Sequence, residues 1–417
     1  MNLSQFGHKF GGTTGIVELM DDLGTALNEN PEMIFMGGGN PGEVPQVEAV
    51  FKQRLQSIVD NPALLRRLTG VYQSPQGDRQ VLVDIAKLLK KQFNWNLTDK
   101  NIAVSNGSQP AFFILYNMLA GTMTDGRHKS IHLPLAPEYI GYSDIGLTEN
   151  FFTATRPDIE LLDNNLFKYH VDFSNIGSLD NTAALCVSRP TNPTGNVLTD
   201  YEIEQLDEIA RNKNIPLIID GAYGLPFPGI LFNQAQPHWN PNTILVLSLS
   251  KLGLPGVRTG IVVASEELIN AFSNANTVVS LACGNLGPMM TAELFKSGDM
   301  LMLGERYVRP FYKHRASEAV DIFRHALGSI PYRIHRPEGA IFLWLWFDGL
   351  PITSQELYER LKRRGVLIVP GHNFFPGMDS TWQHQQECIR VSYAQDATIV
   401  KKGIYMIAEE VKRAYSE

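Results

Sequence analysis

The stretch Ser248-Leu249-Ser250-Lys251-Leu252-Gly253-Leu254-Pro255-Gly256-Val257-Arg258 is the most informative part of this chain. The apolar and β-branched run 243–247 before it predicts a buried strand. A lysine at the end of such a strand suits an amine that must be uncharged to attack a carbonyl. Ser248 and Arg258 beside Lys251 suit a phosphate. The alternative is a solvated lysine in a surface loop.

Other predicted strands end in polar residues of the same kind. Gly107 and Ser108 follow one strand and precede an apolar helix, predicted over 110–120, whose free N–H groups favour a phosphate. Ligands of open α/β sheets bind outside the carboxyl ends of the strands. A phosphate-bearing carbonyl compound held by a lysine points to pyridoxal 5′-phosphate. The predicted strands are 101–105, 130–135, 183–188 and 215–219, and the side chains at strand ends are Ser108, Tyr139, Asn192, Asp220, Tyr223 and Lys251.

Five motifs follow one another along nearly the whole chain: Gly37 to Pro41, Pro134 to Tyr142, Ser188 to Asn196, Val369 to Gly377 and Ile389 to Ala394. On these motifs the chain resembles the fold-type-I pyridoxal-phosphate aminotransferases of the aspartate aminotransferase superfamily. The resemblance implies an α/β fold, with a large domain on a mostly parallel seven-stranded sheet, a smaller α+β C-terminal domain, and a homodimer. The expected division is an N-terminal segment 1–45 that packs with the small domain 301–417, and a large cofactor-binding domain 46–300.

The resemblance also implies catalytic roles. Lys251 would bind the cofactor covalently and move the proton at the substrate Cα, both of which need a desolvated amine. Asp220 would pair with the pyridinium nitrogen and keep the ring protonated; a turn residue after a strand is the alternative. Asn192 and Tyr223 would donate hydrogen bonds to the phenolate oxygen. Tyr139 would lie against the ring face.

The implied contacts to the phosphate come from two subunits. Tyr72 matches the position from which the partner subunit reaches the phosphate, although a packed loop tyrosine is the alternative. The neighbour of Tyr139 is Glu138, where the family often has another aromatic residue. The contacts expected within one chain come from Gly107, Ser108, Gln109, Ser248 and Arg258.

The implied substrate contacts lie at the other end of the site. Arg390 matches the arginine that grips the α-carboxylate in a bidentate fork; a surface ion pair is its alternative. Gly38 and Gly39 would bring backbone close to that carboxylate, and Asn192 would join them. The loop 280–288 carries no cation for a distal carboxylate. Candidates for an apolar side-chain pocket are Ile16, Tyr139 and Phe374.

These contacts favour small aliphatic substrates over dicarboxylic ones, because an unpaired buried carboxylate is costly. The resemblance implies transfer of an amino group by a ping-pong mechanism, and the reaction expected from it moves the amino group of L-valine to pyruvate, giving 3-methyl-2-oxobutanoate and L-alanine. A lyase with the same cofactor is the main rival, because cofactor-binding motifs do not separate transfer from elimination.

Two other classes fit poorly. The run Gly37 to Gly42 matches a dinucleotide-binding pattern, but Pro41 and Pro45 break the region where a helix should open. A cofactor-binding transcription regulator would need a DNA-binding domain and a basic face. The net charge of -7 argues against nucleic-acid and anionic-membrane surfaces.

The remaining composition predicts a cytoplasmic protein. The N-terminus shows no apolar secretory core, and no apolar run approaches the roughly 20 residues that a membrane span needs. Three cysteines, Cys186, Cys283 and Cys388, suit a reducing compartment and buried packing. The ten histidines show no metal spacing, and His372 is expected to be structural.

The pattern also predicts the order of elements beyond the first sheet. Thr199 with Glu202, and Thr353 with Glu356, predict helix N-termini. Residues 288–325 are expected to form helices with a break or kink at Pro310. Further elements are strands over 340–347, 366–369 and 388–392 and a final helix over 397–415.

Overall fold

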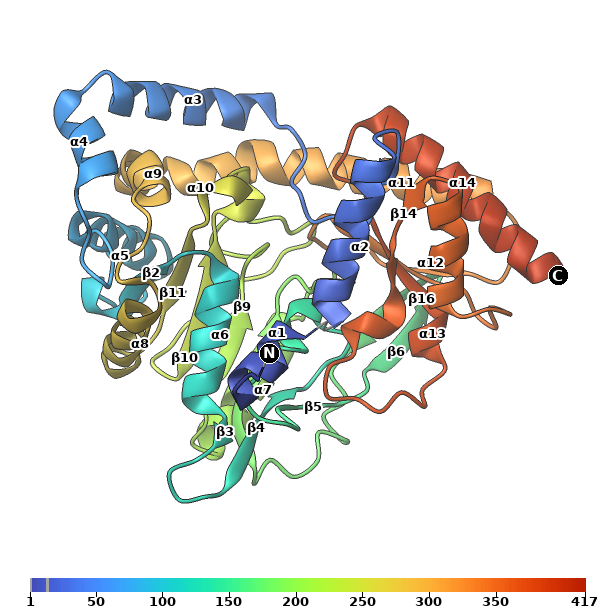
Figure 1. Cartoon of the computed structure of the whole chain (residues 1–417), viewed down its shortest axis with the longest axis horizontal. Helices are drawn as coiled ribbons and strands as arrows, with labels where there is room; N and C mark the ends of the chain where they lie inside the picture. The colour runs from blue at the N-terminus through green and yellow to red at the C-terminus, as the bar shows by residue number, and fades with distance from the viewer. Residues whose placement is uncertain (1, 13–14) are drawn as a thin grey trace.

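The computed structural model describes residues 2–12 and 15–417. A large sheet, with parallel strands at its centre, lies on one side of the molecule, and a second sheet lies beside it (Figure 1). Its strand order is β2-β11-β10-β9-β8-β4-β3, with β5 beside β4. Strands β10, β9, β8, β4 and β5 run parallel, whereas β11 is antiparallel to its neighbours and β3 is antiparallel to β4. The strands are β2 (Ile102–Ser105), β3 (Gly121–Thr122), β4 (His128–Leu133), β5 (Phe152–Ala154), β8 (Thr182–Ser188), β9 (Leu217–Asp220), β10 (Thr243–Ser248) and β11 (Gly260–Val263).

Both faces of this sheet are buried, which explains the continuous apolar runs. In β10, Ile244 and Val246 face one core with α6 and α8, while Leu245 and Leu247 face another with α5 and α7. The sheet has eight strands rather than the expected seven, because the two-residue β3 adds an edge. The flanking helices are α5 (Arg79–Phe93), α6 (Ser108–Leu119), α7 (Asp200–Asn212) and α8 (Glu266–Ser280).

A second sheet of six strands has the order β15-β16-β13-β12-β7-β6. The hairpin β6–β7 comes from the middle of the chain, yet β7 pairs in parallel with β12. The chain therefore leaves the large sheet after β5, forms this hairpin in the second sheet, and returns to the large sheet at β8. The strands are β6 (Asp158–Leu162), β7 (Leu166–His170), β12 (Arg333–His335), β13 (Phe342–Trp346), β15 (Val369–Pro370) and β16 (Cys388–Ser392). The helices beside them are α11 (Arg309–Leu327), α12 (Ser354–Arg363), the short α13 (His384–Glu387) and α14 (Ala397–Ser416).

The N-terminal segment lies beside C-terminal elements. Strand β1 (Ile34–Phe35) pairs in parallel with β14 (Val366–Leu367). The Met36 N–H donates to the Leu367 carbonyl at 2.8 Å, and the Ser392 N–H donates to the Met36 carbonyl at 2.7 Å. The helices α1 (Gln5–Gly11) and α2 (Gly15–Glu29) precede β1, and α3 (Pro45–Val59) and α4 (Pro62–Gly70) follow it. The predicted boundaries at 45 and 300 stay predictions.

Two predicted elements differ from the structure. The single strand expected over 366–369 is two short strands, because β14 pairs with β1 while β15 pairs with β16. The helical stretch is interrupted first at Gly298, between α9 (Leu286–Ser297) and α10 (Asp299–Leu303), and again by a π-helical turn at Gly304–Val308. Pro310 is therefore in the first turn of α11, where its missing N–H is tolerated.

Both predicted N-caps are confirmed. Thr199 and Glu202 form a reciprocal capping box, and the Thr353 side chain accepts from the Glu356 N–H. Within residues 2–12 and 15–417, the helices lack the combination of length and hydropathy needed to cross a bilayer.

Candidate active site

A cavity of about 370 Å³ lies at the carboxyl ends of the central strands of the large sheet. Its wall combines these strand ends with the Gly37–Asn40 segment, β13, β16 and one side of α2. Figure 1 shows α2 in front of the region where the two sheets meet. Twelve of the fourteen predicted site residues line this cavity: Gly38, Gly39, Ser108, Gln109, Tyr139, Asn192, Asp220, Tyr223, Ser248, Lys251, Arg258 and Arg390.

Lys251 lies in a single 3₁₀ turn that follows β10, at residues Ser250–Leu252. Its Nζ donates to the Gly39 carbonyl at 2.5 Å and lies 5.2 Å from the centre of the Tyr223 ring. Burial, followed by the positive charges of Arg390 and Arg258, lowers the pKa of Lys251 to about 8, against the opposing charge of Asp220. Its amine is therefore closer to the uncharged state than an ordinary lysine amine is.

Asp220 is buried at the end of β9. Its Oδ2 accepts a hydrogen bond from the Tyr142 hydroxyl at 2.7 Å, and its Oδ1 accepts from the Ala222 N–H at 2.9 Å. Burial raises the pKa of Asp220, although both hydrogen bonds and the charge of Lys251 oppose this. A cationic partner in the cavity would stabilise its carboxylate. Sequence reasoning missed this role of Tyr142, because the residue lies 78 positions before Asp220 and no local pattern marks the contact.

The cavity has a second end that suits a phosphate. Gly107 is the N-cap of α6 with φ of +106°, and Ser108 opens the helix. A Cβ on Gly107 would lie 2.3 Å from Arg258 Nη2, so glycine keeps the guanidinium next to the helix N-terminus. The Ser248 hydroxyl, at the end of β10, accepts from the Ser250 N–H at 3.2 Å. Backbone donors, hydroxyls and one cation thus converge here.

Arg390, on β16, marks the opposite end of the cavity. Its Nη1 donates to Asn192 Oδ1 and its Nη2 to the Gly37 carbonyl, both at 2.7 Å. The guanidinium lies 4.1 Å from the centre of the Phe342 ring and 4.9 Å from that of Phe374. Burial lowers the pKa of Arg390 to about 10. Its buried Nε has no hydrogen-bond partner among the described residues. The group is held in place and has donor capacity to spare for an anion.

Glu138 is buried behind the cavity wall. Its carboxylate accepts from the Ser188 N–H at 2.7 Å and from the Ser188 hydroxyl. Burial raises its pKa to about 8. Glu138 therefore joins the loop after β4 to the end of β8, while the adjacent Tyr139 lines the cavity with its ring edge-on to Tyr142 at 5.4 Å.

Several residues considered from the sequence lie elsewhere. Tyr72 is 82% exposed and does not line the cavity of its own chain. Phe374 lies behind Arg390 rather than in the cavity, whereas Ile16 lines it. His372 faces the Ser354 hydroxyl at 3.3 Å. The three cysteines are free and buried. Within the described part of the chain, His, Cys, Asp and Glu form no group that could hold a metal ion.

The residues of this cavity fit pyridoxal 5′-phosphate. Arg258 with the α6 N-terminus could hold a phosphate, the buried Asp220 carboxylate could pair with a protonated ring nitrogen, and Lys251 could meet an aldehyde carbon. Arg390 remains available for a carboxylate. A lysine amine and an arginine fork in one cavity suit chemistry on an amino acid.

Comparison with known proteins identifies the class. The family model "Aminotransferase class I and II" matches residues 33–402. The chain belongs to the class I and II aminotransferases.

Within this family, the chain is 49% identical to the valine–pyruvate aminotransferase of Escherichia coli over 417 residues, which cover 100% of both chains. It also resembles the crystal structure of the valine–pyruvate aminotransferase of Salmonella typhimurium, with a TM-score of 0.89 and 47% identity over 97% of this chain and 100% of that one. The aspartate aminotransferase of Thermus thermophilus shares the fold alone, with a TM-score of 0.78 and 19% identity over 98% and 100% of the two chains.

Proposed function

We propose that the chain is a pyridoxal-phosphate-dependent aminotransferase that moves the amino group of L-valine to pyruvate, giving 3-methyl-2-oxobutanoate and L-alanine by a ping-pong mechanism. The observation that carries the proposal is the placement of Lys251 and Arg390 in one cavity, with Asp220 buried beside them. The 49% identity to an enzyme named for valine and pyruvate supports the choice of substrates.

In this reaction Lys251, Asp220 and Arg390 would have separate roles. When bound, pyridoxal phosphate supplies a carbonyl carbon that takes the amino group and a ring that accepts electrons from the substrate Cα. Lys251, with its lowered pKa, would take the proton from the substrate Cα and deliver it to the former carbonyl carbon of the cofactor. Asp220, held by Tyr142, would keep a proton on the ring nitrogen. Arg390, held by Asn192, would bind the α-carboxylate in a fork.

The remaining wall of the cavity favours a small aliphatic side chain. Among the described lining residues, the cations are Lys251, Arg258 and Arg390, each of which already has a role in the proposal. A distal carboxylate of aspartate or glutamate would therefore lose water without gaining a partner. The apolar lining residues include Ile16, Met20, Leu23, Phe35, Phe112 and Ile140.

A panel of amino-acid and 2-oxo-acid pairs tests the proposal. We expect kcat/KM for valine with pyruvate to exceed that for aspartate with pyruvate, and alanine to accumulate in step with valine consumed. A kcat/KM for aspartate equal to or above that of valine would refute the apolar pocket. Release of free ammonia in place of a new amino acid would instead indicate a lyase.

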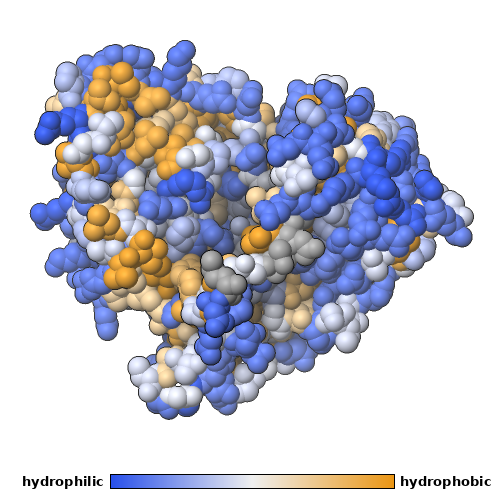
Figure 2. Space-filling view, in the orientation of Figure 1, coloured by the Kyte–Doolittle hydropathy of each residue, from blue (hydrophilic) through white to orange (hydrophobic). Residues whose placement is uncertain are grey.

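We also propose a homodimer with sites that the two subunits complete together. Figure 2 shows apolar side chains gathered around α3 and α4. Tyr72 follows α4 in the chain and is exposed, as a residue that reaches a partner subunit would be. Asn285 joins the segments around this surface, because its side-chain amide donates to the Val71 carbonyl at 2.7 Å. The exposed apolar residues of these and neighbouring elements are Leu55, Val59, Leu65, Val71, Tyr72, Val278, Val279 and Leu281.

Mixing two variants tests this assembly. A mixed dimer of Tyr72→Ala and Lys251→Ala chains would contain one site with both native residues, and activity above the sum of the separate variants is expected. A monomer in sedimentation experiments would contradict the dimer.

Two further points belong to the proposal. The three free, buried cysteines support a cytoplasmic location. The pairing of β1 with β14 supports an N-terminal segment 1–45 that packs with the small domain 301–417, beside a large domain 46–300.

A further inference from the structure

A second buried lysine lies outside the cavity. Lys168, on β7, has a side chain only 2% exposed. Its Nζ donates to the Glu338 carboxylate, to Asn196 Oδ1 at 2.7 Å and to the Val197 carbonyl at 3.1 Å. Glu338 is equally buried, and its Oε2 also accepts from the Val197 N–H at 3.0 Å. The pair is thus surrounded by hydrogen bonds, as a buried ion pair requires.

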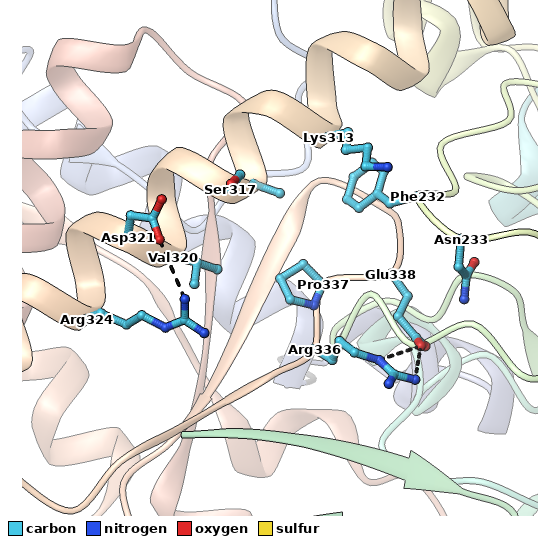
Figure 3. A pocket seen from close by; sticks show the side chains of 11 residues that line it. Phe232, Asn233, Lys313, Ser317, Val320, Asp321, Arg324, Arg336, Pro337 and Glu338 are labelled. Carbon is cyan, nitrogen blue, oxygen red and sulfur yellow. Dashed lines mark hydrogen bonds and ion pairs between the residues drawn. The ribbon is translucent and has the colours of Figure 1, made fainter. Parts of the chain in front are cut away.

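The two oxygens of Glu338 face in different directions. While Oε2 faces Lys168, Oε1 accepts from Arg336 Nε at 2.9 Å and from Arg336 Nη2 at 2.6 Å. Arg336 is 43% exposed and lines a separate cavity of about 510 Å³ beside α11 (Figure 3). Glu338 therefore has a partner on the solvent side and another in the interior, which restricts its carboxylate to one position.

The residues that Lys168 contacts, Asn196 and Val197, belong to the loop 191–197, which connects the ion pair to the active site. The Thr191 N–H donates to the Asn196 carbonyl and the Gly195 N–H donates to the Thr191 carbonyl, both at 2.8 Å. Gly195 has φ of +71°, and a Cβ there would lie 2.7 Å from the Gly339 carbonyl, next to Glu338. The loop begins where β8 ends, whereas Lys168 belongs to the second sheet. The ion pair thus joins the loop to the second sheet.

Asn192 lies within this loop and accepts the hydrogen bond from Arg390. We propose that Lys168 and Glu338 are positioning residues for substrate binding, because they hold the loop 191–197 in the place where Asn192 orients the Arg390 fork. Neither residue lines the active-site cavity. The inference rests on the proposed function, since it assigns the substrate carboxylate to Arg390.

The test compares Lys168→Met and Glu338→Gln with a matched control. Glu410→Gln removes another buried carboxylate, on α14, which pairs at 3.0 Å with Arg364 at the C-cap of α12. Two readouts are used: hydrogen exchange of the Thr191 and Gly195 amides in cofactor-free protein, and the Kd of the cofactor-loaded enzyme for 2-methylalanine, which has no Cα hydrogen to lose.

We expect exchange of both amides to accelerate, and the Kd to rise at least about tenfold in the two variants, because small displacements of a binding group are costly. The control should change neither readout. Asn196→Ala keeps the ion pair but removes its side-chain hydrogen bond to the loop. We expect this variant also to show faster amide exchange and a higher Kd, and it provides the test if the other two variants fail to fold. Readouts that match the control would overturn the inference. Absence of transamination by the wild-type enzyme would instead overturn the proposed function, which the exchange readout does not require.

Discussion

The molecule buries two lysines in different surroundings. Lys168 is met by a carboxylate, an amide oxygen and a backbone carbonyl, whereas Lys251 meets a backbone carbonyl beside the positive charges of Arg390 and Arg258. Burial lowers the pKa of both lysines. At Lys168 the charge and the hydrogen bond of Glu338 oppose this, whereas at Lys251 the charge of Asp220 opposes it without a hydrogen bond. Burial alone therefore does not make a lysine reactive. The number and charge of its partners decide whether the amine is fixed or available.

Replacing each lysine is expected to give the largest difference between the two regions, in turnover and in the free energy of unfolding. Lys251→Ala should lower turnover at least about 10⁴-fold, because the covalent attachment and the proton carrier are both lost. Its free energy of unfolding should not fall, since a poorly compensated buried charge is removed. Lys168→Met should instead lower that free energy, because Glu338 loses its partner. Steady-state kinetics and urea unfolding measure both effects. Near-normal turnover by Lys251→Ala would remove the central claim.

Asp220→Asn tests whether the Asp220 carboxylate pairs with the protonated ring nitrogen of the cofactor. The rate of a single half-reaction should fall about 10²- to 10³-fold, because a neutral amide cannot hold the ring nitrogen protonated. Rapid mixing with valine measures this rate, and the KM for valine serves as the control. An effect on affinity alone would show that Asp220 has another role.

Arg390→Lys tests the opposite end of the cavity. A point charge would replace a fork that both Asn192 and Gly37 orient. The KM for valine should rise about 10- to 100-fold, as expected for lost hydrogen bonds to a charged group, with a smaller change in kcat. If kcat alone changed, the assignment of the carboxylate to Arg390 would be wrong.

The smallest expected effect concerns the pH dependence of Lys251 in cofactor-free protein. Its pKa of about 8 lies below the usual value of about 10.4, so the unfolded chain binds more protons between these values. Stability should therefore rise with pH across that window, by an increment absent from Lys251→Met. Acetylation rates followed by mass spectrometry should show the Lys251 pKa lowered further in Asp220→Asn and raised in Arg390→Leu. Shifts in the opposite directions would contradict these assigned causes.

The residues at strand ends were the most predictable part of the site. Asp220, Ser248 and Ser108 follow buried strands whose apolar runs can be read directly, and parallel strands bring such ends to one edge. Tyr142 could not be predicted in the same way. Its hydroxyl meets Asp220 across 78 positions of sequence, and no local pattern links the two residues. The split of 366–369 into two strands likewise depends on two different neighbours.

The family, the order of the main strands and helices, and the residue types that a phosphate, a ring nitrogen and a carboxylate need can all be read from the amino-acid sequence. These follow from local periodicity and from motifs a few residues long. Three contacts became visible in the folded molecule alone: Gly39 accepts from Lys251, Tyr142 donates to Asp220, and Lys168 and Glu338 join the Asn192 loop to the second sheet. Each of these contacts joins segments far apart in the chain, and its geometry is set by how the two sheets pack together rather than by any local pattern.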